Sequence, residues 1–198
     1  MNTKDYWFGW PLKCKYTNEL KYVNKVVSSF LIKKAEQCRN NGKDLSKYLV
    51  VFDLDETLFM GDPKKTLQLS PMTYVDPSNK NEYIFILPPN KSIVDIAKLS
   101  HKLGFTNICI TARPMDAKDS SIHNLKMYDI PYNALIMNDK EQDPCFKIKQ
   151  RIQLSSDSRE IICTIGDQLT DLFLPGPNAC AVKLPNEDLA CAYIYLPM

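Results

Sequence analysis

Two carboxylates follow a short apolar run early in the chain. Residues 49–52 are of the leucine, valine and phenylalanine types that suit a buried strand, and Asp53 ends this run. Asp55 lies two residues further on, so both carboxylates can point to the same side of an extended chain. Because two like charges so close repel each other, we expect a metal ion or a shared proton beside them. Aspartates also end strands as turn formers and helix caps, so the pair alone is compatible with a structural role.

Two later apolar runs are also followed by polar residues that could do chemistry. Thr111 comes after one run, and Asp167 and Asp171 come after another, while Lys147 lies near the start of an expected helix. The C-terminal ends of parallel strands meet at one edge of a sheet, so these side chains should converge on one cleft, where open α/β sheets bind ligands. Carboxylate oxygens are ligands that Mg²⁺ prefers, and the candidates are Asp53, Asp55, Asp167 and Asp171.

The elements that must position these residues alternate along the chain. Runs of strand length are found at residues 49–52, 107–110, 132–137, 160–165 and 179–184. Helices are expected over residues 17–40, 90–103, 116–127 and from about 143 through 151, with Asn41-Gly42 and Gly104 as stop signals. This alternation predicts an α/β fold, with a Rossmann-like parallel sheet of about five strands and helices on both faces.

One structural domain is expected, with residues 1–47 as an N-terminal aromatic arm and helix and residues 48–198 as the core. The arm carries an aromatic cluster that would either strap across the domain or contact a partner or membrane. Its aromatic residues are Tyr6, Trp7, Phe8 and Trp10.

The segment between the first strand and the next helix, residues 61–89, is too short to bury a core of its own. Within it, residues 72–75 and 83–87 can pair as a hairpin. We therefore expect a small flap instead of a large cap domain, and an open site that a second copy of the chain could cover. Four aromatic residues could stack a nucleobase or simply pack within the hairpin: Phe59, Tyr74, Tyr83 and Phe85.

The motifs of residues 49–171 resemble those of a known superfamily. In order they are D-x-D-x-T at 53–57, an apolar run ending in Thr111, then Lys147, then G-D-x-x-x-D at 166–171. This order is similar to that of phosphatases of the haloacid dehalogenase (HAD) superfamily. Four short motifs resemble one branch in particular, the class B and plant acid phosphatases of HAD subfamily IIIB. They are T-A-R-P at 111–114, K-x-x-x-R at 147–151, G-D-Q at 166–168 and K-L-P-N at 183–186.

The resemblance implies a Mg²⁺-dependent phosphomonoesterase that works through an aspartyl-phosphate. Asp53 would be the nucleophile, and Asp55 would protonate the leaving oxygen and later deprotonate the hydrolytic water. The implied phosphate-binding residues are Thr111, Ala112 and Lys147, and the implied metal-binding residues are Asp53, Asp55, Asp167 and Asp171.

Three of these assignments have simpler alternatives. Thr111, expected at a helix N-terminus that would hold a phosphate oxygen, can be an ordinary β-branched strand residue. Lys147 can be a surface residue, with Lys149 or Lys140 in its place. Asp171 can be a cap that offsets a helix dipole.

The substrate is expected to be a small phosphorylated molecule such as a nucleotide. One alternative is a phosphatase of phosphoproteins or nucleic-acid ends, which would use the open site and the basic N-terminal region. Another is a HAD-like binding protein without catalysis, although Asp53 argues against it because the nucleophile is present.

The composition is that of an ordinary globular protein, with 198 residues, 44% of them hydrophobic and 24% charged. A net charge of +2 is no strong signal for nucleic acid. The seven cysteines are odd in number and lack C-x-x-C spacing, which favours reduced thiols. No run of 18 apolar residues predicts a membrane span, and the N-terminus lacks the apolar region of a signal peptide, so we expect a cytoplasmic protein.

Overall fold

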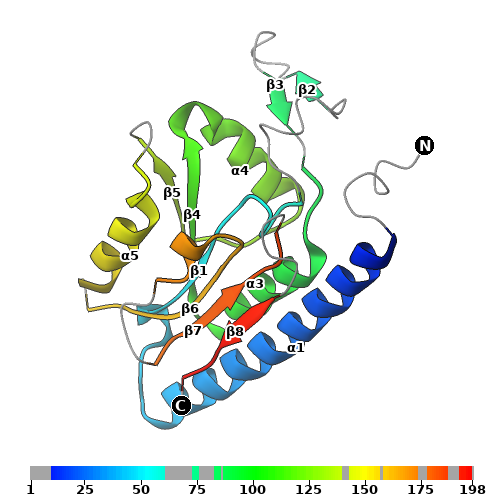
Figure 1. Ribbon diagram of the computed structural model, residues 1–198. Coiled ribbons are helices and arrows are strands. Elements are labelled where there is room, and N and C mark those ends of the chain that lie inside the picture. Colours follow the sequence, from blue (N-terminus) through cyan, green and yellow to red (C-terminus); the bar gives the residue numbers. More distant parts are fainter. Residues whose placement is uncertain are drawn as a thin grey trace.

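A six-stranded sheet runs through the centre of the protein (Figure 1). This computed structural model describes residues 10–60, 73–75, 83–85, 87–139, 143–156, 158–173, 178–186 and 192–197, with the backbone alone at 10–17, 73–75, 83–85 and 156. The strands are β1 (Tyr48–Phe52), β4 (Thr106–Pro114), β5 (Ala134–Asn138), β6 (Glu160–Gly166), β7 (Cys180–Lys183) and β8 (Tyr193–Tyr195).

The order across the sheet is β5-β4-β1-β6-β7-β8, and every neighbouring pair is parallel except β7 and β8. The predicted parallel sheet of about five strands is therefore confirmed. The antiparallel edge strand β8 was not predicted, because three residues are too few to show a clear alternation of apolar and polar side chains.

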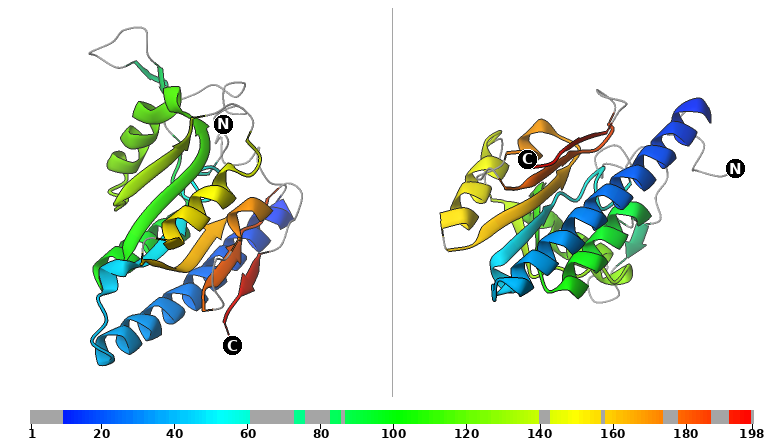
Figure 2. Two further views of the ribbon diagram at one scale, coloured as in Figure 1. Left: turned by 90° about the vertical axis from the view of Figure 1, so that its left-hand side faces the viewer. Right: turned by 90° about the horizontal axis from the view of Figure 1, so that it is seen from below.

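Helices cover both faces of the sheet, as predicted. They are α1 (Trp10–Asn40), α3 (Lys91–Leu103), α4 (Lys118–Met127) and α5 (Phe146–Ser156), accompanied by the 3-10 turns η2 (Leu45–Lys47), η3 (Met115–Ala117) and η4 (Leu169–Asp171). The views in Figure 2 show α1 and α3 side by side on one face and α5 on the other.

Side chains along β1 alternate between two apolar cores. Val50 and Phe52 lie in the larger core, with residues of α1 and α3, whereas Leu49 and Val51 lie in a smaller core with Phe146 of α5. Because both faces are buried, the strand reads as an unbroken apolar run, as parallel strands do.

Helix α1 begins at Trp10, seven residues earlier than the helix predicted from residue 17. Pro11 is compatible with this start, since a first-turn N–H has no partner within the helix. Three residues without exposed surface, Val23, Val27 and Leu31, lie on the face that packs into the larger core. Gly42 ends the helix as predicted, with a φ of 61°. The rest of the aromatic arm lies outside the described residues.

Helix α3 begins and ends where its signals predicted, but not entirely by the expected contacts. Gly104 terminates it in the left-handed conformation, at a φ of 103°. Asn90 occupies the N-cap position, yet its side chain makes no capping hydrogen bond, and its backbone carbonyl accepts from the amides of Ile93 and Val94 instead.

The predicted hairpin is present as β2 (Thr73–Val75) paired antiparallel with β3 (Tyr83–Phe85). It lies between β1 and α3 along the chain, in the segment where a flap was expected. The other residues between 61 and 86 lie outside the described part of the chain.

No helix among the described residues has the length and apolarity that crossing a bilayer requires. The cysteines whose side chains are described carry free thiols: Cys38, Cys109, Cys145, Cys163 and Cys180. The side chains of Cys14 and Cys191 are outside that set, so the reduced state of all seven stays a prediction.

Candidate active site

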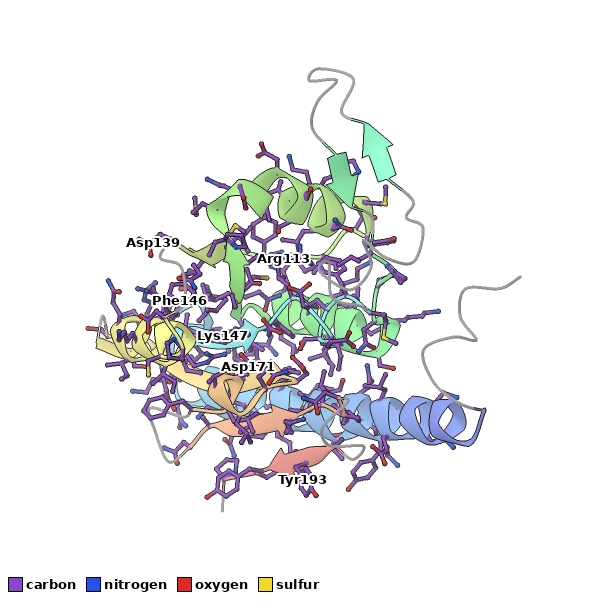
Figure 3. All side chains as sticks on the ribbon, turned by 45° about the horizontal axis from the view of Figure 1, so that its top comes forward. Arg113, Asp139, Phe146, Lys147, Asp171 and Tyr193 are labelled. Carbon is purple, nitrogen blue, oxygen red and sulfur yellow. The ribbon has the colours of Figure 1, made fainter. Side chains whose placement is uncertain are left out.

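Three strand ends and the first turn of α5 meet at the C-terminal edge of the sheet. Strand β1 lies between β4 and β6, so Asp53, directly after β1, is flanked by Thr111 of β4 and Asp167 after β6. Figure 3 shows Arg113, Lys147 and Asp171, from β4, α5 and η4, facing the same central region, far from Tyr193 on the edge strand. The tertiary structure thus brings together residues that are more than 100 positions apart in sequence.

Asp53 is held at the centre of this region. Its backbone N–H donates to the carbonyl of Ile165 at 3.0 Å, which continues the contact between β1 and β6 beyond the strand. Lys147 Nζ lies 2.6 Å from Asp53 Oδ1, and the hydroxyl of Thr57 donates to Oδ2 at 3.3 Å. With both oxygens held, this buried carboxylate has one defined orientation, which displacement at phosphorus requires of a nucleophile.

Three buried carboxylates form what we call the carboxylate cluster: Asp53, Asp167 and Asp171. One oxygen from each lies within 4.8 Å of the other two. Burial, followed by repulsion from Asp53 and Asp171, raises the pKa of Asp167 to about 6. Burial and Asp53 also raise the pKa of Asp171, against the opposing effects of Lys147 and Arg151. Three anions drawn together in this way call for a cation, and their all-oxygen donor set fits Mg²⁺.

Gly166 allows Asp171 to approach the strand end. A Cβ at position 166 would overlap the Cβ and the carboxylate of Asp171. Asp167 is oriented by its neighbours, because Gln168 Nε2 donates to its Oδ2 at 2.7 Å and Asn186 Nδ2 donates to its backbone carbonyl at 2.8 Å. The G-D-x-x-x-D motif therefore has glycine at its first position because any side chain there would clash with Asp171.

Asp171 has two roles that the sequence presented as alternatives. Its Oδ2 accepts a hydrogen bond from the amide of Gln168 at 3.1 Å, so the residue does cap the turn η4. Its Oδ1 lies 2.8 Å from Lys147 Nζ and belongs to the carboxylate cluster. The capping bond fixes the side chain that the cluster uses.

Lys147 lies between two members of the cluster, 2.6 Å from Asp53 and 2.8 Å from Asp171. Burial by itself would lower the pKa of Lys147, but the two carboxylates outweigh it and the pKa is raised, so the ammonium stays charged. Lys149 is instead 65% exposed and pairs with Asp143 at 2.9 Å. The alternative that Lys149 takes this place is therefore wrong, while Lys140 lies outside the described residues.

Asp55 is held by Arg113, which in the sequence is part of the T-A-R-P motif. Arg113 donates from Nε to Asp55 Oδ2 at 2.9 Å and from a terminal nitrogen to Oδ1 at 2.6 Å. Its other terminal nitrogen donates to Ser121 Oγ at 2.8 Å, and its guanidinium lies 5.7 Å from the ring centroid of Phe59. The Asp55 carboxylate is a quarter exposed and outside the cluster, so its role as a metal ligand stays a prediction.

The backbone after Asp55 turns sharply. Glu56 adopts a φ of 56°, in the left-handed region that non-glycine residues rarely occupy. Such strain persists where the surroundings over-determine the conformation, and it is concentrated at functional sites. The turn brings Thr57 back toward Asp53, to which its hydroxyl donates.

Thr111 lies inside a strand, so its predicted place at a helix N-terminus is wrong. Strand β4 continues to Pro114 through an irregularity in its pairing with β5, and α4 begins only at Lys118. Thr111 is fully buried, and its hydroxyl accepts from the amide of Arg113 at 3.2 Å, while Ala112 is exposed. Phosphate binding by Thr111 and Ala112 stays a prediction.

Phe59 is fully buried, with its ring centroid 6.3 Å from that of Tyr128. It is therefore a core residue and cannot stack on a nucleobase. The side chains of Tyr74, Tyr83 and Phe85 lie outside the described part of the chain.

Arg151 is a second arginine next to the carboxylate cluster, and in the sequence it is part of the K-x-x-x-R motif. It lies one helical turn after Lys147 and has no exposed surface. A basic residue four positions after an active-site lysine was the available signal, since residues i and i+4 share a helix face.

Comparisons with known proteins identify the family of the chain and proteins of similar fold. The model of the family described as HAD superfamily, subfamily IIIB (acid phosphatase) matches residues 10–188. The class C acid phosphatase from Bacillus anthracis superposes with a TM-score of 0.56 at 22% identity, over 86% of this chain and 68% of that one. Its tungstate-bound form gives a TM-score of 0.53 at 21% identity, with the same coverage. None of the curated proteins compared matches the chain. At this identity the structural likeness shows the fold alone.

Proposed function

The chain belongs to subfamily IIIB of the HAD superfamily, the acid phosphatases, and we propose that this phosphomonoesterase transfers the phosphoryl group of its substrate to Asp53 with the help of Mg²⁺. The observation that carries the proposal is the position of Asp53, which is both a member of the carboxylate cluster and the partner of Lys147 at 2.6 Å. A purely structural aspartate would not need two further buried carboxylates beside it. Family membership also argues for an enzyme against a non-catalytic binding protein.

Mg²⁺ would be held by the carboxylate cluster, whose three oxygens suit a hard cation. When bound, the ion would neutralise the negative charge that otherwise repels a phosphate dianion from an anionic nucleophile. Lys147 would add a fixed positive charge next to Asp53, where negative charge develops on the transferring group.

In the first half-reaction an oxygen of Asp53 attacks phosphorus, and the bond between phosphorus and the ester oxygen breaks. Asp55 in its protonated form gives its proton to the departing oxygen, so that an alcohol leaves. The Asp55 carboxylate is a quarter exposed, in contrast to the buried cluster, and can exchange protons with the surroundings.

In the second half-reaction Asp55, now ionised, takes a proton from water, and the resulting oxygen attacks the phosphorus of the aspartyl-phosphate. The bond from phosphorus to Asp53 breaks, releasing inorganic phosphate and the free carboxylate, and the proton left on Asp55 serves the next turnover. Arg113 supports this step, because a guanidinium that donates to both oxygens fixes the direction in which the Asp55 carboxylate points.

The substrate class we propose is a small phosphate monoester. The segment between β1 and α3 is too short to form a large cap domain, which would leave room for leaving groups of varied shape. Tungstate, a tetrahedral oxyanion that is bound in a structure of the class C acid phosphatase from Bacillus anthracis, is accordingly expected to inhibit this enzyme in competition with substrate.

The test is turnover of 4-nitrophenyl phosphate with Mg²⁺, with excess EDTA and in the Asp53→Asn variant. We expect EDTA to stop turnover and Asp53→Asn to lower kcat by about 10⁴-fold or more, with an unchanged melting temperature. Peptide mapping of acid-quenched enzyme should find the phosphoryl group on Asp53 of the wild type only. Asp129→Asn is the matched control, because Asp129 is exposed and an asparagine tolerates its φ of 50°. Full activity in EDTA or in Asp53→Asn would contradict the mechanism.

A further inference from the structure

Arg151 is an arginine without exposed surface, and it lies next to the carboxylate cluster. Taking a guanidinium out of water costs several kcal/mol unless its charge and its donors are matched. Burial accordingly lowers the pKa of Arg151, while Asp171 and then Asp53 act in the opposite direction. The position of such a residue needs a reason beyond packing.

The hydrogen bonds of Arg151 join three elements of the site. Its Nε donates to the hydroxyl of Thr164 on β6 at 3.3 Å, and one terminal nitrogen donates to the carbonyls of Lys147 on α5 at 3.0 Å and Thr170 on η4 at 3.3 Å. The turn η4 carries Asp171, and α5 carries Lys147. One side chain therefore fixes the helix of the active-site lysine relative to the turn of a cluster carboxylate.

A second path connects Arg151 to the same aspartate. Thr164, which accepts from Arg151, donates its own hydroxyl proton to the backbone carbonyl of Asp171 at 2.6 Å. The other terminal nitrogen of Arg151 lies 3.5 Å from Asp171 Oδ1, close enough for charge attraction though not for a strong hydrogen bond. Arg151 therefore acts on Asp171 in two ways: through Thr164 on its backbone carbonyl, and by its charge on the carboxylate.

We propose that Arg151 is a positioning residue that sets the affinity of the carboxylate cluster for Mg²⁺. By fixing η4 through Thr170 and Thr164, it holds Asp171 beside Asp53 and Asp167, and its charge offsets part of the repulsion among the three carboxylates. This inference rests on the proposed function, in which the cluster holds the metal. Groups that orient metal ligands without touching the metal typically change its affinity by 10–100-fold when they are removed.

The variant Arg151→Lys keeps the positive charge but loses the planar fork, so it cannot reach Thr164, Thr170 and the Lys147 carbonyl together. Thr164→Val keeps the shape of the side chain but removes both of its hydrogen bonds. We expect Mg²⁺, titrated alone into the phosphate-free protein in a calorimeter, to bind about 10–100-fold more weakly to Arg151→Lys and by a smaller factor to Thr164→Val.

Ser100→Ala is the matched control. Ser100 is also fully buried and donates a hydrogen bond, to Asn107 at 2.7 Å, but it lies outside the elements that carry the cluster. Its loss should lower the melting temperature while Mg²⁺ affinity stays within twofold of the wild type, which separates a general loss of stability from an effect on the metal site.

Wild-type affinity in both Arg151→Lys and Thr164→Val would overturn the assignment and leave the proposed function intact. If Arg151→Lys does not fold, Thr164→Val decides alone, and an unchanged affinity in that variant overturns the proposal. If the wild type itself binds no Mg²⁺, the metal site of the proposed function fails and the role of Arg151 fails with it.

Discussion

Two arginines face aspartates in this active site, and they hold them in opposite ways. Arg113 donates from two of its nitrogens directly to the Asp55 carboxylate, at 2.6 and 2.9 Å, and that carboxylate is a quarter exposed. Arg151 gives its hydrogen bonds to backbone carbonyls and a hydroxyl, and the Asp171 carboxylate, fully buried, lies 3.5 Å away.

The difference follows from what each aspartate has to do. In the proposed mechanism Asp55 gains and loses a proton in every turnover, so it needs contact with solvent or substrate and a partner that defines its direction. In the same proposal Asp171 keeps one position next to two other carboxylates. Its backbone carbonyl accepts from Thr164, and Lys147 and Arg151 offset its charge. In this proposal one arginine serves proton transfer, and the other serves the geometry of the carboxylate cluster.

The largest effect that tests this division is expected from Asp55→Asn. General acid assistance is worth about 10²–10⁴-fold, but an aryl oxide leaves readily without it. The variant should therefore slow phosphoenzyme formation much more for an alkyl phosphate than for 4-nitrophenyl phosphate. With the aryl substrate, rapid-quench kinetics should show a burst and accumulation of phosphorylated Asp53, because the second step lacks its base.

Arg113→Lys is the companion variant. We expect it to slow alkyl phosphates more than 4-nitrophenyl phosphate, by a smaller factor than Asp55→Asn, because lysine keeps the charge but not the paired hydrogen bonds to Asp55. Mg²⁺ affinity is expected to be little changed in this variant, in contrast to Arg151→Lys. Equal slowing of both substrates by Asp55→Asn, without a burst, would take the proton-transfer role from Asp55.

Gly166→Ala tests the other half of the comparison. The added Cβ would overlap Asp171, so the aspartate or the strand end must move. We expect Mg²⁺ binding to weaken by at least about tenfold, with little change in the preference between alkyl and aryl substrates. Gly42→Ala is the control. It also adds a Cβ to a glycine, at a strained φ of 61°, but no atom lies within 4 Å of the new Cβ. Mg²⁺ affinity unchanged by Gly166→Ala would mean that the cluster does not hold the metal as a unit.

The smallest effect concerns pH. The pKa of Asp167 in the metal-free protein is about 6, above its ordinary value of 3.8. Between these values the folded protein holds a proton that the unfolded chain does not, so falling pH stabilises the metal-free fold through this group and rising pH removes that contribution. Protons also compete with Mg²⁺ below pH 6, where affinity should fall by up to about tenfold per pH unit.

Thermal unfolding in EDTA between pH 4 and 7, together with calorimetry of Mg²⁺ binding, measures both trends. Asp167→Asn should lack the stabilisation that the wild type gains on acidification across this range. Parallel pH profiles for the two proteins would show that Asp167 is not the group that takes up the proton.

The local sequence was sufficient to place most elements, because their signals are local. Apolar runs bounded by polar residues predicted five of the six strands, and glycines 42 and 104, with φ of 61° and 103°, ended their helices as expected. The motifs also led to the correct family, since D-x-D-x-T, Lys147 and G-D-x-x-x-D retain their order along the chain.

What local sequence could not decide was which groups pair across the site. Lys147 and Lys149 are the same residue type two positions apart, and only the packing of α5 buries the first beside Asp53 and leaves the second exposed. Arg113 meets Asp55 across 58 positions, and Arg151 reaches Thr164 from another element. Ion pairs between side chains far apart in sequence depend on distances and burial, and those exist only once the sheet has assembled.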